Sequence, residues 1–267
     1  MDRIRIEIQG KTAVLFMDNE KKINCITKKM LEELVKQVDK CNNNTNISCV
    51  IITGTGEKAF TSGGDLKAEM QYATSEHEMI DTYNRLGVKL VKSIMNSPKA
   101  YIAAINGYAL GAALGMIAAC DIAIGSENSV YGLPTGSLGG IPGWGCTQQV
   151  TRLIGKQCVM RMLLLNEKID AKEAQKYNLI SEILPINQLK ERAFEIANQI
   201  SSCPQNTIQA IKKCVYEGLE SSLEEGLELE AQILYRTNTH PNFGEGILAF
   251  LEKREPEFII NLPQNHD

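Results

Sequence analysis

Apolar and polar residues alternate at the start of the chain and predict a strand over residues 4–8. The apolar run 13–17 predicts a second strand, joined to the first by a turn at Gly10-Lys11. The period then changes to that of a helix, predicted over residues 27–41. Its apolar residues, which fall on one face, are Met30, Leu31, Leu34, Val35 and Val38.

Strands and helices continue to alternate up to about residue 145, after which the pattern is helical. Further strands are predicted over residues 50–53, 101–105 and 121–125. A long helix is predicted over residues 76–95, ending before Pro98, and a short one from Gly111. The later helices are predicted from the capped start at Asp170 and over residues 186–201, 204–217, 223–237 and 242–253. The pattern predicts an α/β core over residues 1–200 and a helical C-terminal region over residues 201–267.

Composition narrows the class of protein. A chain of 267 residues with 43% apolar residues can bury one sizeable core, and a net charge of −4 does not favour nucleic-acid binding. Eight cysteines without Cys-x-x-Cys pairs, and only three histidines, argue against a metal site. The longest apolar stretch, residues 101–124, is interrupted by Asn106 and Asp121, and the N-terminus lacks a signal-peptide pattern. We expect a cytoplasmic protein with reduced thiols and no membrane partner.

Two glycine-rich breaks carry the candidate chemistry. The first spans residues 60–66 after the apolar run 50–54, and the second spans residues 106–115 after the run 101–105. Glycine at such a break lets the backbone approach a ligand closely, and a helix start leaves backbone N–H groups unpaired. Two breaks facing one site would supply two donors to one oxygen. That arrangement is an oxyanion hole, suited to an enolate or a tetrahedral thioester adduct.

These segments resemble the enoyl-CoA hydratase/isomerase (crotonase) superfamily. Residues 62–67 (Ser-Gly-Gly-Asp-Leu-Lys) are similar to its Ala-Gly-Ala-Asp-Leu-Lys signature, and residues 106–111 match its Asn-Gly-Tyr-Ala-Leu-Gly run. Asn24-Cys25, residues 141–145 and residues 250–254 match further stretches in the same order. The resemblance implies a spiral of β-β-α turns with a helical C-terminal region, assembled as trimers or dimers of trimers. It also implies that an acyl-CoA is the substrate.

By this resemblance the oxyanion donors are the backbone N–H groups of Gly64 and Ala112. Hydratases of the family hold a water between two glutamates, and this chain has Gly115 and Thr135 at those places. Neither residue exchanges a proton as a carboxylic acid does near neutral pH. Hydration by the usual acid–base pair is therefore not expected.

The resemblance also supplies candidates for substrate and CoA binding. Structural alternatives remain open for them: a solvated surface lysine, an N-cap at the aspartate, and a packing anchor at the single tryptophan. On the loop and helix that line the family's acyl site, Glu69, Tyr83 and Arg85 stand out, with Glu69 and Arg85 the charged groups to test after the donors. The binding candidates are Lys21, Asn24, Cys25, Ser62, Asp65, Leu66, Trp144 and Lys253.

Several reactions are compatible with this picture. The resemblance predicts an enzyme that acts on an acyl-CoA thioester, with CoA entering as part of the substrate and no other cofactor. Decarboxylation fits best on physical grounds, because it asks less of a paired acid and base than hydration does. Isomerisation, thioester hydrolysis, action on carrier-protein thioesters and non-catalytic acyl-CoA binding are the alternatives.

Overall fold

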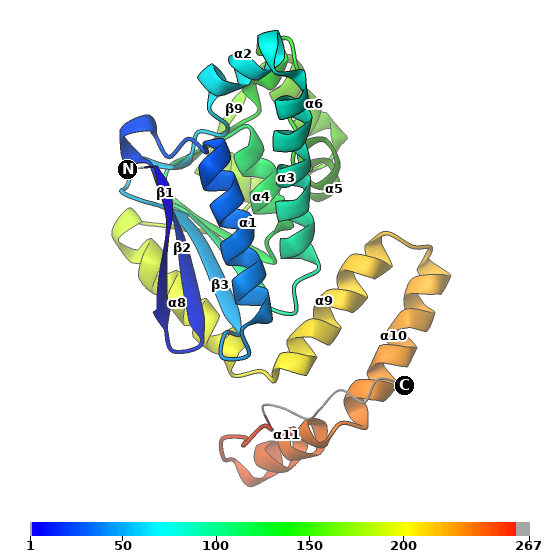
Figure 1. Ribbon diagram of the computed structural model, residues 1–267. Coiled ribbons are helices and arrows are strands. Elements are labelled where there is room, and N and C mark those ends of the chain that lie inside the picture. Colours follow the sequence, from blue (N-terminus) through cyan, green and yellow to red (C-terminus); the bar gives the residue numbers. More distant parts are fainter. Residues whose placement is uncertain (1, 260–267) are drawn as a thin grey trace.

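The computed structural model describes residues 2–259, so the predicted C-terminal region includes residues 260–267 that lie outside the described part. The larger of two sheets has six strands in the order β1-β2-β3-β5-β7-β10 (Figure 1). Neighbours in it run parallel, except for the antiparallel hairpin of β1 and β2. The six strands are β1 (Arg3–Gln9), β2 (Thr12–Asp18), β3 (Cys49–Gly54), β5 (Ala100–Ile105), β7 (Ile122–Ser126) and β10 (Glu182–Leu184).

The smaller sheet has four short strands in the order β4-β6-β8-β9, and β4, β6 and β8 are parallel to one another. Along the chain β3 is followed by β4, β5 by β6, and β7 by β8. The first strand of each pair joins the larger sheet and the second joins the smaller. The chain thus winds through repeated strand–strand turns, with helices following them, and the carboxyl ends of β4 and β6 become neighbours. The four strands are β4 (Ala59–Thr61), β6 (Tyr108–Leu110), β8 (Val130–Gly132) and β9 (Lys168–Asp170).

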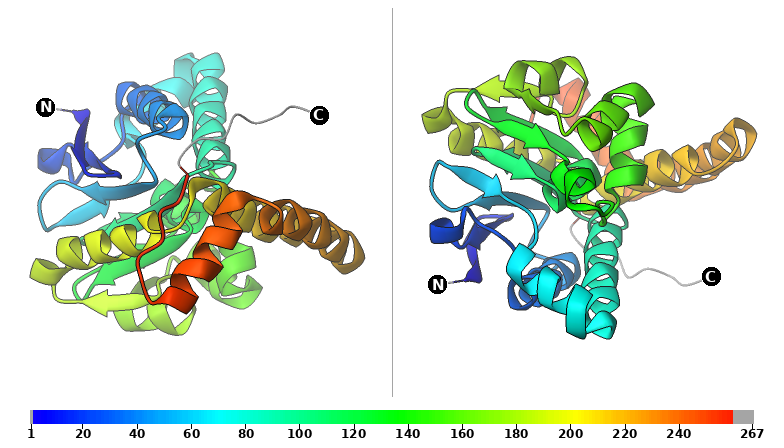
Figure 2. Two further views of the ribbon diagram at one scale, coloured as in Figure 1. Left: turned by 90° about the horizontal axis from the view of Figure 1, so that it is seen from below. Right: turned by 90° about the horizontal axis from the view of Figure 1, so that it is seen from above.

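Helices cover both faces of the larger sheet (Figure 2). On β3, Val50 and Ile52 face the core that also contains the apolar residues of α1 (Lys28–Asn43) and α3 (His77–Met95). The alternate residues Cys49 and Ile51 pack with α8 (Ile186–Ser201) on the other face. A strand buried on both faces needs apolar residues at successive positions, which explains the unbroken apolar runs of the sequence. The remaining helices of the core are α2 (Leu66–Ser75), α4 (Ala112–Ala119), α5 (Thr151–Ile154), α6 (Lys156–Leu164) and α7 (Ala171–Lys176), with short helical turns at Glu20–Lys22, Pro134–Leu138 and Cys146–Val150.

The last three helices form an arm that leaves the core: α9 (Gln205–Leu219), α10 (Leu223–Asn238) and α11 (Pro241–Glu252) (Figures 1 and 2). The buried Lys212 side chain helps to anchor α9 to the core. The Lys212 ammonium donates to the Asp121 carboxylate at 2.9 Å and to the carbonyls of Lys99 and Ile94 at 2.9 and 3.1 Å. Burying a lysine is tolerated here because its charge is paired and its donors are used. Among the described residues, no helix is long and apolar enough to cross a membrane.

The long elements lie where the sequence places them. All five predicted strands correspond to β1, β2, β3, β5 and β7, with ends within one residue, and the helix over residues 186–201 is α8. Asp170 caps α7 through a capping box with Glu173. The three-residue strands of the smaller sheet and the helix α2 were not predicted, and they are the elements that build the candidate site.

Candidate active site

The two glycine breaks meet in space, and each contains part or all of a short strand. The second break begins directly after β5 and contains β6, whereas the first overlaps β4, which residues 55–58 separate from β3. The strands β4 and β6 pair in parallel, with Ala59 opposite Tyr108 and Thr61 opposite Ala109. The expectation that each break directly follows a long strand is therefore confirmed for the second break and wrong for the first. A three-residue strand is too short to show a repeat, yet it sets which loops become neighbours.

Both proposed donors are free. Among residues 2–259, the backbone N–H groups of Gly64 and Ala112 have no hydrogen-bond partner. Ala112 is the first residue of α4, where a helix leaves its N–H groups unpaired and carries a partial positive charge. The loops touch, because a Cβ atom placed on Gly63 would lie 2.9 Å from the Leu110 carbonyl oxygen and 3.7 Å from the Ala112 nitrogen. The structure thus brings the two free N–H groups to adjoining loops, as an oxyanion hole requires.

Gly115 lies buried in α4, and the loop 141–145 closes the space beside it. A Cβ atom on Gly115 would overlap the carbonyl oxygen of Trp144 and lie 2.9 Å from its carbonyl carbon. The Trp144 indole is 3% exposed and lies flat against Gly87 of α3, where a Cβ atom would overlap the ring. Trp144 also has a φ of 56°, in the left-handed region that a residue with a side chain seldom adopts. Position 115 therefore has no room for a side chain while this loop stays in place.

Thr135 lies in the short helical turn Pro134–Leu138 and is partly buried. Its hydroxyl makes no hydrogen bond to any described residue, so it is free to bind a water or a substrate oxygen. The two places of the missing glutamates therefore differ: backbone closes the space beside Gly115, whereas Thr135 presents a hydroxyl without a partner among the described residues.

Asn24 and Cys25 support the first break. The Asn24 side chain is 1% exposed and donates to the carbonyls of Thr55 and Ala59 at 2.9 and 2.7 Å. Its carboxamide oxygen accepts from the Asn19 N–H, and burial raises the pKa of the Cys25 thiol. With its amide fully used inside the protein, Asn24 is placed to hold the loop rather than to bind a ligand.

The other binding candidates around the first break are more exposed than Asn24 and Cys25. Asp65 caps α2 by accepting from the Lys67 N–H, and Lys22 reaches it at 3.4 Å. Ser62 follows β4 with a partly buried side chain. Leu66, at 58% exposed, opens α2. Lys21, in the turn Glu20–Lys22, is exposed near the same loops.

Lys253 is not brought to this site within one chain. It follows α11 at the far end of the arm, whereas α2 lies at the opposite end of the molecule (Figure 1). Arg85 points outward and pairs with Asp81, while His77 is exposed and contacts the Ala73 carbonyl. Neither of these two is placed to meet a ligand held by Gly64.

Glu69 is turned inward against the first break. A Cβ atom on Gly64 would overlap its carboxylate oxygen Oε1 and would lie 3.0 Å from the Tyr83 hydroxyl. Partial burial, and then the negative charge of Asp65, raise the pKa of Glu69. The Tyr83 hydroxyl donates to the Ile26 carbonyl at 3.0 Å, and its ring packs on Trp144 at 5.6 Å between centroids. The sequence predicts Glu69 as a charged group to test. Position 64 is glycine where the family signature has alanine, and the missing Cβ leaves space for the Glu69 carboxylate.

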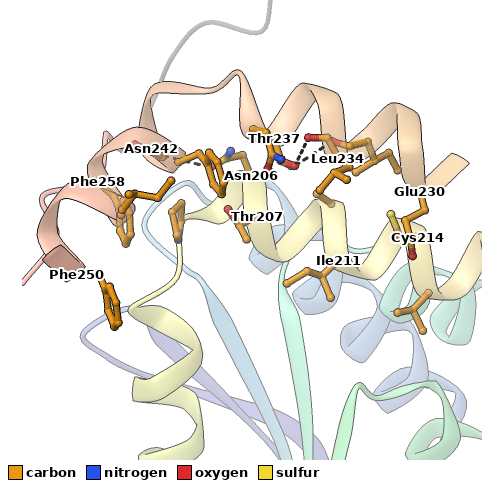
Figure 3. Close-up of a pocket in the computed structure, with 18 of the residues that line it drawn as sticks. Asn206, Thr207, Ile211, Cys214, Glu230, Leu234, Thr237, Asn242, Phe250 and Phe258 are labelled. Carbon is orange, nitrogen blue, oxygen red and sulfur yellow. Dashed lines mark hydrogen bonds between the residues drawn. The ribbon is translucent and has the colours of Figure 1, made fainter.

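An apolar cavity lies elsewhere. A volume of about 720 Å³ opens between the three helices of the arm, lined mainly by aliphatic and aromatic side chains (Figure 3). Its few polar groups, among them Thr207, Asn206 and Glu230, come without a nucleophile–base pair or a charged cluster. Such a surface suits burial against another apolar surface more than it suits chemistry.

Comparison with known proteins adds to this geometry. The family model described as enoyl-CoA hydratase/isomerase matches residues 7–260. The 2,3-dehydroadipyl-CoA hydratase of Escherichia coli is 32% identical over 97% of this chain and 99% of that protein. The crotonyl-CoA hydratase of Syntrophomonas wolfei is 31% identical, over 97% and 98%.

Solved structures give the same result for the fold. An enoyl-CoA hydratase from Bacillus anthracis superimposes with a TM-score of 0.91 at 32% identity, covering 97% of this chain and 99% of that one. An enoyl-CoA hydratase from Polaromonas superimposes with a TM-score of 0.92 at 26% identity, covering 96% and 100%. The chain therefore has the spiral of β-β-α turns with a helical C-terminal region that its motifs imply.

Proposed function

Because this chain belongs to the enoyl-CoA hydratase/isomerase family, we propose that it converts an acyl-CoA through an enolate held between the N–H groups of Gly64 and Ala112. Two preorganised donors stabilise the charge that develops on the thioester oxygen, and losing one such donor typically costs about 10²–10³ in rate. The proposed reactions are those that need an enolate and no activated water: a shift of a double bond or loss of carbon dioxide. CoA enters as part of the substrate.

One observation carries the choice of reaction class. The two places where family hydratases carry glutamates hold Gly115 and Thr135, and the Trp144 carbonyl occupies the space of a side chain at position 115. Hydration needs a base that deprotonates the attacking water and an acid that donates a proton to the substrate. Neither Gly115 nor Thr135 can be that base or that acid. The names of the relatives favour hydration, so hydration of an enoyl-CoA is the competing function.

Turnover of a panel of acyl-CoA thioesters, followed by mass spectrometry, decides between them. The panel contains crotonyl-CoA, a 3-enoyl-CoA, methylmalonyl-CoA and glutaconyl-CoA. A double-bond shift or loss of carbon dioxide without added water supports the proposal. Hydration of crotonyl-CoA at ordinary enzyme rates contradicts it. Micromolar binding with no turnover would indicate a non-catalytic binder, and turnover only on a phosphopantetheinylated carrier would indicate a carrier-protein substrate.

Self-assembly through the arm is the second part of the proposal. Its helices expose large apolar side chains, including Leu223 at 80%, Leu251 at 71% and Phe250 at 82%. A monomer seldom exposes so many neighbouring apolar groups, so we expect other copies of this chain to cover them as a trimer or dimer of trimers. Such contacts would also give Lys253 a route to a neighbouring copy's CoA. Light scattering should give three or six chains per particle, fewer for Phe250→Asp, and a monomeric wild-type protein would contradict the assembly.

A further inference from the structure

The structure places the Glu69 carboxylate, in addition to that of Asp65, beside the proposed oxyanion hole. Glu69 belongs to the first turn of α2, where a glutamate normally points into water and interacts with the helix dipole. Here the side chain folds back, so that Oε1 fills the space next to the Gly64 Cα atom where other residues carry a Cβ. The same glycine therefore offers its N–H as a donor and its open side to a carboxylate.

No cation or donor neutralises this carboxylate. Within residues 2–259 the Glu69 side chain takes part in no ion pair or hydrogen bond, and the ammonium group of Lys22 pairs with Asp65 instead. The titratable groups beside it are Asp65, the N-cap of α2, and Tyr83 from α3, and Tyr83 in turn neighbours Tyr72 and Cys25. A partly buried carboxylate without a partner is unfavourable for folding, which is typical of a group retained for chemistry.

The titratable groups of Tyr83, Tyr131 and Cys146, which also lie beside the two breaks, do not exchange a proton near neutral pH. Burial, and then the Glu69 charge, raise the pKa of Tyr83, whose proton is committed to the Ile26 carbonyl. Burial also raises the pKa of the Tyr131 hydroxyl, and raises that of the Cys146 thiol to about 12. Near neutral pH these groups stay protonated, so Glu69 is the one among them that can accept and return a proton.

From this arrangement we infer that Glu69 is the single catalytic acid–base residue of the site and that it moves a proton along a β,γ-unsaturated acyl-CoA. This inference rests on the proposed function. The Glu69 carboxylate takes a proton from the carbon next to the thioester carbonyl; the C–H electrons form a new double bond as the carbonyl electrons move to oxygen. Gly64 and Ala112 hold that oxyanion. Glu69 then returns the proton two carbons further along, the carbonyl re-forms, and the product is the conjugated isomer.

Charge favours this substrate over one that loses carbon dioxide. A decarboxylated substrate would place its own carboxylate near Glu69 and Asp65, and like charges at short range repel. A double-bond shift keeps the acyl group neutral, needs no second acid and consumes no water. One carboxylate that can reach both carbons is therefore enough.

The test is conversion of a 3-enoyl-CoA to its 2-enoyl isomer by the full-length protein, with deuterium incorporation measured in D₂O. Glu69→Gln keeps the shape of the side chain and should lower kcat by about 10²–10⁴-fold with little change in KM. Gly64→Ala keeps the backbone donor but displaces the carboxylate, and should lower kcat at least tenfold. Glu78→Gln, an exposed glutamate of α3, is the matched control and should retain the wild-type rate.

A pH profile separates a catalytic from a merely structural role. The rate of the wild-type protein should fall toward acid through the pKa of Glu69, at higher pH than for an ordinary glutamate, because its ionised form is the base. The residual rate of Glu69→Gln should lack that step. Circular dichroism and binding of a saturated acyl-CoA confirm that both variants are folded and loaded.

The outcomes are distinguishable. If Glu69→Gln isomerises at the wild-type rate while Ala112→Pro is inactive, the proposed function stands and the role of Glu69 is wrong. If the wild-type protein releases carbon dioxide from an acidic thioester without shifting a double bond, the substrate class is wrong. If it binds these thioesters but converts none, the proposed function and this inference fail together.

Discussion

The two breaks are both rich in glycine but differ in what fills the space beside them. At the first, the flexible end of a side chain, the Glu69 carboxylate, lies against Gly64. At the second, fixed backbone lies against Gly115, since the Trp144 carbonyl occupies the space of a Cβ. Both breaks supply a free N–H, from Gly64 and from Ala112. One break is therefore open to a group that can move protons, and the other is closed.

This difference suggests that acid–base chemistry lies at the opposite break from the family's hydratases. Trp144 connects the two sides: its indole rests on Gly87 and its ring packs on Tyr83, which lies next to Glu69 in turn. The loop that excludes a side chain at position 115 thus also forms part of the wall behind the carboxylate. The exclusion of a side chain at position 115 and the position of Glu69 therefore depend on the same packed loop.

The strongest test of the closed break is Gly115→Glu. The new side chain would collide with the backbone of residues 144–146, which Trp144 fixes from both sides, so the loop must move or the helix α4 must shift. We expect destabilisation of about 4 kcal/mol or more, at the upper end for single substitutions. Urea unfolding followed by circular dichroism measures it.

Gly139→Glu provides the control, because Gly139 is exposed and a Cβ there has open space. Its φ of 79° makes a small loss of stability unavoidable, about 1 kcal/mol, but no collision occurs. A Gly115→Glu protein as stable as this control would show that the loop yields, and the second break would then have to be regarded as open.

The next largest effect is expected for Ala112→Pro, which removes one donor of the hole. Proline is favourable at the first position of a helix, and Ala112 is the first residue of α4. A residue before proline prefers an extended conformation. The preceding Gly111 has φ 57° and ψ −123°, the mirror image of that conformation, which glycine can adopt because it has no side chain. The fold should survive while turnover drops by about 10²–10³-fold.

Steady-state turnover of the best thioester in the panel measures this loss. Ala113→Ser, one residue further into the helix, keeps the backbone N–H and serves as the comparison. If Ala112→Pro folds and works at the wild-type rate, the oxyanion hole is assigned to the wrong residues.

Much of this fold could be predicted from the sequence, because its long elements repeat a pattern many times. Helix α8 was placed at both ends from its apolar period, and the strand pair β1 and β2 from its turn at Gly10-Lys11. The three-residue strands β4 and β6 contain no full repeat, so their pairing, which positions both donors, was not visible. The resemblance to known motifs named Gly64 and Ala112 without that pairing.

The chemistry beside the donors could not be predicted in the same way. Whether a glutamate in a first helical turn faces water or the site depends on the space at Gly64, a contact that no local pattern encodes. Likewise, Gly87 inside the helix over residues 77–95 indicates close packing, because glycine there costs about 1 kcal/mol relative to alanine. That the group packed against Gly87 is the Trp144 indole could not be predicted, because the two residues are far apart in the chain.

The smallest expected effect is that of Gly64→Ala on the free energy of unfolding, which compares the open break with the closed one without measuring activity. Gly64 does not have a positive φ, so alanine fits its backbone, and only the end of the Glu69 side chain and the edge of Tyr83 must give way. Gly64→Ala should therefore stabilise the protein by about 0.5 kcal/mol at neutral pH, through the lower entropy of its unfolded chain and the release of the Glu69 carboxylate into water.

The pH dependence of that small gain tests its link to Glu69. Because the pKa of Glu69 is raised in the folded protein, the folded state holds its proton more tightly than the unfolded chain does. The wild-type protein therefore loses stability as the pH rises through this pKa. Pushing the carboxylate into water removes the loss, so Gly64→Ala should stabilise more at pH 8 than at pH 4, in urea titrations at both. An equal gain at the two pH values would mean that Glu69 already lies in water in the wild-type protein, and the two breaks would then differ only in that one is closed.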